Sequence, residues 1–122
     1  MRPEQARSRI EAELSYARAA REHGKEGRAR VSARRAAGWA VAVFLGSHSE
    51  PPTRGAFDLL GWLEREGPAN LRQAAARLRQ QVTEDHRLPH VEDPLDDAAL
   101  IVRTLLALLD ATQSSAGPAA ES

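Results

Sequence analysis

The segment from Gly27 to Gly46, GRARVSARRAAGWAVAVFLG, constrains the fold more than any other part of the chain. Its arginines all lie in the first half, and the ten residues before Gly46 carry no charge. As a helix, the uncharged run 36–45 would be about 15 Å long, which is half the hydrocarbon thickness of a bilayer. The run is therefore too short to span a membrane.

Helical periodicity gathers the apolar side chains of this segment on one face. Arg28 and Arg35 fall beside Trp39 on one flank of that face, and Arg30 and Arg34 lie on the other flank. Because alanine has a small side chain, such a face lets neighbouring helices approach closely. We therefore predict a core helix of a bundle, ended by Gly46 and with an inner face of Ala29, Ala33, Ala36, Ala40, Val43 and Phe44.

The rest of the chain also predicts helices, because alanine, leucine, arginine and glutamate dominate and no alternating β-branched run occurs. Gly24 ends the first helix, and Asp93 caps the last one, which begins at Pro94. We expect an all-α fold, an up-and-down bundle of four to five helices forming one domain over 1–112, followed by a disordered tail over 113–122. The other expected helices cover about 4–22, 54–66, 68–82 and 94–112.

The charges balance overall but are unevenly distributed. The chain has 17 basic and 17 acidic residues, with ten basic against five acidic in 1–35 and seven against twelve in 36–122. It contains no cysteine, which excludes disulfides, thiolate nucleophiles and cysteine-ligated metals. The N-terminal segment has no apolar signal-peptide core, so we expect a cytoplasmic protein without a membrane partner.

Three segments carry a resemblance to the HEPN family of helical bundles. YARAAREHGKEGRARVSARRAAGWAVAVFL resembles the end of the first helix and the alanine-rich second helix, FDLLGWLE the next segment, and DPLDDAALIVRTLLALL the final helix. The resemblance covers about residues 5–112, although Ala56 stands where closer members have histidine. It implies a dimerising bacterial bundle whose relatives act as RNases in toxin–antitoxin or defence systems, bind nucleotides, or partner a minimal nucleotidyltransferase.

RNase members of that family place an arginine four to six residues before a histidine near the final helix. Arg79 and His86 match this spacing near the expected place, whereas Arg18 and His23 match it on the first helix. Such a pair would supply a general acid–base imidazole and a cation for the scissile phosphate. However, Glu84 and Asp85 directly precede His86 and would repel an RNA phosphate.

Two further sets of residues suggest binding. His86 and His90 have the spacing of zinc ligands on a helix, although Pro89 between them disfavours a helix. Arg28, Arg35 and Trp39 could stack on a base or nucleotide ring, or the arginine stems could cover a half-buried tryptophan.

The sequence thus favours an interaction module over an enzyme. We expect no cofactor and a homodimer, formed through the alanine-rich helix or through Ile101, Leu105 and Leu108 of the final helix. The chain would be a partner subunit of a bacterial defence, toxin–antitoxin or nucleotide-handling system, with a nucleotidyltransferase-type protein as a candidate partner. The alternatives are a metal-independent RNase using Arg79 and His86, and a non-catalytic dimeric scaffold; nucleotide or RNA would be the ligands of the Arg28, Arg35 and Trp39 flank.

Overall fold

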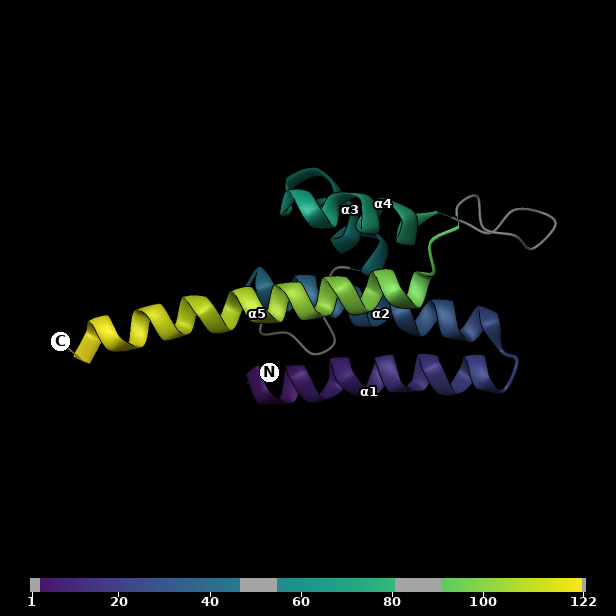
Figure 1. Ribbon diagram of the computed structural model, residues 1–122, viewed down its shortest axis with the longest axis horizontal. Coiled ribbons are helices and arrows are strands. Elements are labelled where there is room, and N and C mark those ends of the chain that lie inside the picture. Colours follow the sequence, from purple (N-terminus) through teal and green to yellow (C-terminus); the bar gives the residue numbers. More distant parts are fainter. Residues whose placement is uncertain (1–2, 47–54, 81–90, 122) are drawn as a thin grey trace.

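The structure, a computed structural model, describes residues 3–46, 55–80 and 91–121, with side chains to residue 112 (Figure 1). Its described residues are almost entirely helical and contain no strand, which confirms the all-α prediction. No helix in these ranges combines the length and the hydropathy that crossing a bilayer requires. The helices are α1 (Pro3–Glu22), α2 (Glu26–Phe44), α3 (Ala56–Glu66), α4 (Ala69–Arg79) and α5 (Pro94–Glu121).

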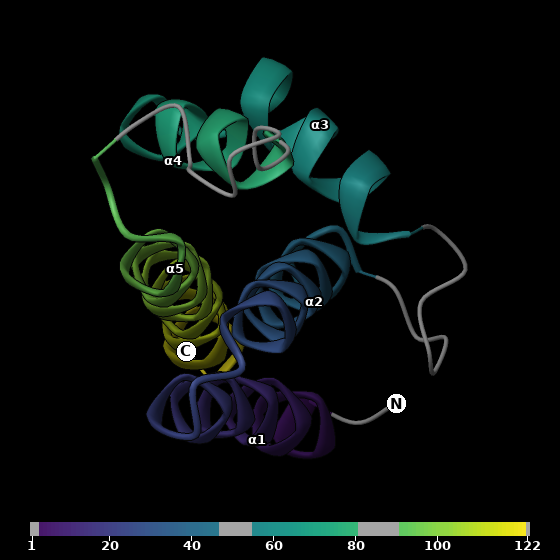
Figure 2. The same ribbon diagram turned by 90° about the vertical axis from the view of Figure 1, so that its right-hand side faces the viewer.

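Helix α2 lies at the centre of the bundle and packs against α1, α3 and α5. Helix α1 runs antiparallel to α2, whereas α5 runs beside α2 in the same direction (Figure 1). Helices α3 and α4 cross the three long helices, so that α3 packs on α2 and α4 packs on α5 (Figure 2). This crossing pair stands between α2 and α5 in the chain and thereby lets those two helices run parallel.

The alanine-rich face of α2 is completely covered by these neighbours. Its small side chains allow α1, α5 and α3 to approach α2 on three sides at once. A dimer through this face is therefore excluded unless the bundle opens, contrary to one expectation from the sequence. The alanines of α2 that are at most 2% exposed are Ala29, Ala33, Ala36, Ala37, Ala40 and Ala42.

Gly38 lies where α2 and the start of α3 approach most closely. A Cβ atom at Gly38 would lie 2.9 Å from both the Cα and the Cβ atoms of Ala56. Glycine inside a helix costs roughly 1 kcal/mol relative to alanine. The close approach of Ala56 accounts for its presence here.

The predicted helix ends are confirmed at three places. Gly24 and Gly46 adopt φ angles of 75° and 83°, which favour glycine and end α1 and α2. Asp93 caps α5, because its Oδ1 atom accepts a hydrogen bond of 3.0 Å from the backbone N–H of Leu95.

Two other expected ends are wrong. Helix α4 stops at Arg79, short of the expected residue 82, because Gln80 is extended and Arg34 satisfies the carbonyl groups at this end. Helix α5 continues to Glu121, past the expected end near 112 and into the expected tail. No glycine or proline occurs over 110–116, which accounts for the helix passing residue 112 but not for its continuing through Gly117 and Pro118.

The expected surplus apolar surface on α5 is also largely absent. Ile101 and Leu105 are 0% exposed, because α5 packs against α1, α2 and α4 together. Leu108 is 40% exposed and is the part of that expected dimer surface that faces solvent. Ile101 and Leu105 are therefore buried within one chain and cannot form the expected dimer surface.

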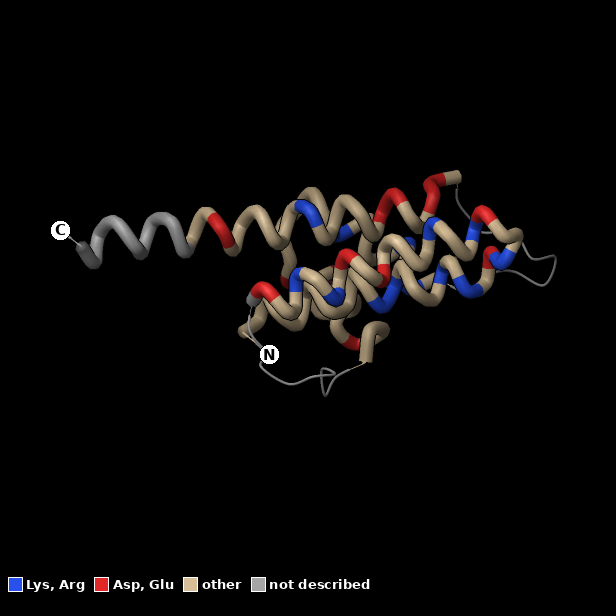
Figure 3. The backbone as a smooth tube through the Cα atoms, turned by 90° about the horizontal axis from the view of Figure 1, so that it is seen from below, with Lys and Arg blue, Asp and Glu red and all other residues tan. Residues whose placement is uncertain are grey.

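Basic residues from the first part of the sequence and acidic residues from the second part lie close together in the fold. Basic residues gather where α1 passes into α2, and acidic residues gather at the start of α5, at the same end of the bundle (Figure 3). Arg21 of α1 binds Asp93 with nitrogen–oxygen distances of 2.5 and 2.8 Å. Part of the sequence polarity is therefore neutralised by ion pairs within the chain, such as Arg21–Asp93 and Arg7–Asp110.

Candidate functional site: a groove between α1 and α5

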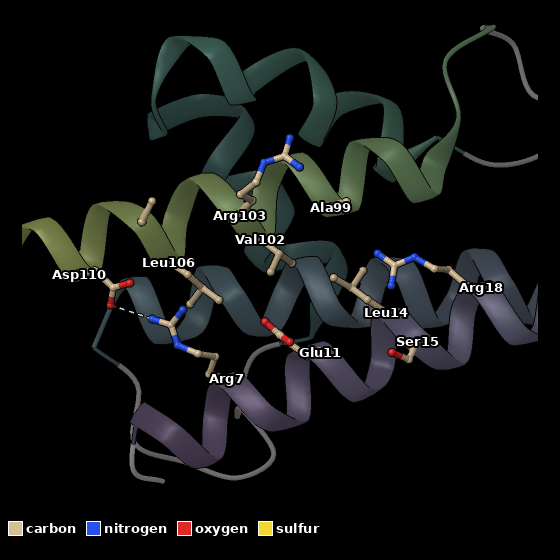
Figure 4. A pocket seen from close by; sticks show the side chains of 11 residues that line it. Arg7, Glu11, Leu14, Ser15, Arg18, Ala99, Val102, Arg103, Leu106 and Asp110 are labelled. Atoms are coloured by element: carbon tan, nitrogen blue, oxygen red, sulfur yellow. Dashed lines mark hydrogen bonds and ion pairs between the residues drawn. The ribbon is translucent and has the colours of Figure 1, made fainter.

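A groove of about 380 Å³ runs between α1 and α5 (Figure 4). Its base consists of the buried apolar side chains of Leu14, Val102 and Leu106. Small residues and charged residues line its sides. We call this surface the α1–α5 groove, lined by Arg7, Glu11, Leu14, Ser15, Arg18, Ala99, Val102, Arg103, Leu106, Ala107 and Asp110.

The groove exists because α1 and α5 both pack on α2 and touch each other much less. The alanines of α2 draw both helices close to it, while Ser15, Ala99 and Ala107 are too small to fill the space between α1 and α5. A groove with a largely buried apolar base is thereby left between residues 7–18 of α1 and residues 99–110 of α5.

One end of the groove is bridged by an ion pair. Arg7 of α1 donates from Nη2 to Oδ1 of Asp110 on α5 at 2.8 Å (Figure 4). Both side chains are largely exposed, at 43% and 58%, so solvent screens this pair strongly. The contact shows that a carboxylate on α5 can reach an arginine of α1 across the groove.

Two other arginines on the groove have no such partner. Arg18 on α1 and Arg103 on α5 are exposed, and neither forms an ion pair or hydrogen bond with another described residue. Glu11, also exposed, lies on α1 between Arg7 and Arg18 (Figure 4). The α1–α5 groove therefore combines an apolar base with two cations, on opposite sides, that have no partner among the described residues.

A second ionic cluster lies at the start of α5 and is structural. Arg21 bridges Asp93 and Glu26, and its hydrogen bonds lower the pKa of both carboxyl groups below their ordinary values. Arg77 donates to the buried Asp97 at 2.8 and 2.9 Å, and this contact raises the pKa of Arg77. These contacts fasten the first turn of α5 to α1, α2 and α4.

Of the predicted RNase pair, Arg79 is described, whereas His86 lies outside the described residues. Arg79 ends α4 and donates from Nη1 to a carboxylate oxygen of Glu64 on α3. Its guanidinium carbon lies 4.3 Å from the centroid of the Phe57 ring. Arg79 therefore ties α4 to α3, and its Nε atom is buried without a partner among the described residues.

The candidate metal ligands His86 and His90 both lie outside the described residues. Within the described ranges, no group of three or more histidine, aspartate and glutamate side chains has an arrangement that could hold a metal ion.

The predicted nucleotide-binding flank is present but differently arranged. Arg28 is exposed, and Arg35 donates to Oε1 of Glu13 on α1 at 3.2 Å. The arginine that covers Trp39 is Arg9 of α1, with its guanidinium carbon 5.9 Å from the centroid of the ring. The half-buried tryptophan is thus covered by an arginine guanidinium, and the covering residue comes from another helix than expected.

Sequence reasoning missed the α1–α5 groove. The spacing of Arg7, Glu11 and Arg18 puts charges along one side of α1, and Arg103 and Asp110 repeat this on α5. That pattern is visible in the sequence, but the pairing of α1 with α5 is not. Comparison with models of known families, with curated proteins and with solved structures finds no match.

Proposed function

We propose that the chain is a non-catalytic interaction module that binds a helix of a partner protein in the α1–α5 groove. The observation that carries this proposal is the groove itself, at whose base Leu14, Val102 and Leu106 each keep between 4% and 8% of their surface exposed. Docking of an apolar helix face into a groove is a common mode of peptide recognition.

The dimensions of the groove agree with a helix as its occupant. From Arg7 to Arg18 along α1 the groove extends about 16 Å, at about 1.5 Å per residue. This length equals about three helical turns, which places apolar anchors of a bound helix at positions i, i+4 and i+7. The small side chains of Ser15, Ala99 and Ala107 permit a close approach.

The wider role that we propose follows from the resemblance to HEPN bundles. In that role the chain is a cytoplasmic partner subunit of a bacterial defence, toxin–antitoxin or nucleotide-handling system. A nucleotidyltransferase-type protein is one candidate for the partner that supplies the helix. A second copy of the chain is the other candidate occupant, and a homodimer would then form through the same groove.

The RNase alternative has less support. Arg79 already binds Glu64 and stacks on Phe57, so it would have to leave both to meet a phosphate. Nucleotide binding by Arg28, Arg35 and Trp39 is weakened for a similar reason, since Glu13 holds Arg35 and Arg9 covers Trp39.

Site-specific photocrosslinking in cells tests the proposed function. A photoreactive amino acid is placed at Ala107 in the α1–α5 groove, and in a control at Val31, which is 49% exposed on α2. We expect Ala107 alone to give a discrete adduct whose crosslinked peptide, identified by mass spectrometry, belongs to a helix of another protein. No adduct from Ala107, or the same adduct from both positions, would contradict the proposal.

A further inference from the structure

We infer that the helix bound in the α1–α5 groove is amphipathic and acidic, with carboxylates that meet Arg18 and Arg103. This inference rests on the proposed function, because it specifies the chemistry of the partner for the same groove. It follows from which charges on the groove are already neutralised and which are not.

Most arginines that touch a neighbouring helix in this bundle have an acceptor. Arg7, Arg21, Arg35, Arg77 and Arg79 bind carboxylates, and Arg34 binds backbone carbonyl groups. Arg18 and Arg103 differ, because they lie beside an apolar surface and have no acceptor among the described residues. A ligand that covers the apolar base would bury part of both guanidinium groups, which is unfavourable unless it also supplies acceptors.

The two arginines flank the groove from opposite sides. Arg18 lies on α1 at the end remote from the Arg7–Asp110 pair, and Arg103 lies on α5 between the two ends (Figure 4). A helix lying in the groove presents residues three or four apart on each of its sides. Carboxylates on both flanks of its apolar stripe would therefore reach both arginines.

The remaining charges limit where those carboxylates lie. Glu11 stands on the α1 side between Arg7 and Arg18, and it would repel a carboxylate placed directly opposite. Asp110 already occupies Arg7 at the far end. The acidic residues of the partner therefore belong to the half of its helix near Arg18 and Arg103, with neutral or basic residues opposite Glu11.

The test uses three synthetic helical peptides about four turns long, with the same leucines at i, i+4 and i+7. The positions flanking these leucines carry glutamate, glutamine or lysine in the three versions. Binding to the full chain is measured by fluorescence anisotropy at low salt and at physiological salt. We expect the glutamate peptide to bind roughly fivefold more tightly than the glutamine peptide, and the lysine peptide more weakly than both.

The same peptides are then measured with Arg18→Glu combined with Arg103→Glu, which should reverse the order so that the lysine peptide binds best. Arg28→Glu combined with Arg65→Glu is the matched control, because it makes the same charge change at two exposed positions outside the groove. Circular dichroism checks folding, and Arg18→Gln alone, which should abolish part of the preference for glutamate, replaces the double variant if that variant unfolds.

Equal binding of all three peptides, unchanged in the double variant, would overturn the inference and leave helix docking in place. Binding of none of them, together with no adduct at Ala107, would overturn both the inference and the proposed function. Sedimentation of the chain alone as a dimer that Arg18→Glu with Arg103→Glu dissociates would overturn the acidic partner in favour of a second copy.

Discussion

Arg34 of α2 donates a hydrogen bond of 2.6 Å from Nε to the backbone carbonyl oxygen of Leu78 in the last turn of α4. Its Nη2 atom donates a second bond of 2.7 Å to the carbonyl of Gln80. The C-terminal end of a helix leaves carbonyl groups without intrahelical partners. A cation beside them is also stabilised by the partial negative charge of the helix dipole at that end. Partial burial and the neighbouring Arg30 lower the pKa of Arg34, although the group stays charged at neutral pH.

Replacing Arg34 by methionine should destabilise the bundle by about 2 kcal/mol. The aliphatic part of the side chain is kept, but two hydrogen bonds from a charged donor are lost and the carbonyl groups of Leu78 and Gln80 lose their partner. Urea denaturation monitored by circular dichroism measures the change. Arg28→Met, at an exposed position of the same helix, should change stability by less than about 0.5 kcal/mol; equal losses in the two variants would refute the capping role.

The close contact between α2 and α3 predicts that Gly38→Ala is destabilising. The new Cβ atom would lie 2.9 Å from backbone and side-chain atoms of Ala56, so the two helices must move apart, at a cost of roughly 1–3 kcal/mol. Gly27→Ala in the first turn of the same helix meets no atom within 4 Å and should be neutral or stabilising. Thermal unfolding of both variants measures these effects. A melting temperature of Gly38→Ala at or above that of the wild type would show that the contact between Gly38 and Ala56 is not tight.

The ion pairs of Arg21 predict a defined dependence on pH. The pKa values of Asp93 and Glu26 are lowered in the folded protein, so these groups contribute stability above their unfolded pKa values of about 4 and lose it as the pH falls through their folded values. Arg21→Met should therefore lower the melting temperature at pH 7. The difference from the wild type should shrink as the pH falls below about 4.

Thermal unfolding of both proteins between about pH 7 and 2.5 measures this difference in melting temperature. Arg28→Met is the control, and its melting temperature should follow that of the wild type at every pH. A gap between Arg21→Met and wild type that persists unchanged at the lowest pH would mean that Arg21 acts through packing of its stem alone.

For catalysis, we expect no RNA cleavage above background by the isolated protein. Arg79 is held by Glu64 and Phe57, and Glu84 and Asp85 precede His86 in the sequence. A fluorescent mixed-sequence RNA is incubated with the wild type and with His86→Ala in the presence of EDTA. Cleavage that the wild type performs and the variant does not would make the RNase the leading function.

The fold could be predicted in outline because its signals are local. Alternation of apolar and charged residues at helical spacing located all five helices, and Gly24, Gly46 and Asp93 marked ends that depend on their own backbone conformation or side chain. Four inner alanines of α2 were identified for the same reason, namely Ala29, Ala33, Ala36 and Ala40, whereas the buried Ala37 and Ala42 were missed. The end of α4 was misplaced because Arg34, 44 residues earlier in the chain, determines it.

The candidate site depends on contacts between distant residues and was therefore missed. Nothing within α1 or α5 indicates that Arg7 faces Asp110 or that Leu14 lies beside Val102. The contact of Trp39 was missed in the same way, since periodicity within α2 placed Arg28 and Arg35 beside it, whereas the guanidinium over its ring is that of Arg9 from α1. Helical periodicity shows which residues share a face, whereas the order in which faces meet is set by packing of the whole bundle.

The most direct test of the account is to map where the acidic helical peptide binds on the isotope-labelled protein by amide chemical shifts. We predict that the shifts concentrate on Leu14, Arg18 and their neighbours in α1, and on the α5 residues from Ala99 to Ala107. Shifts centred on α3 and α4, or on the flank of Arg28, Arg35 and Trp39, would contradict the claim that the α1–α5 groove is the binding site.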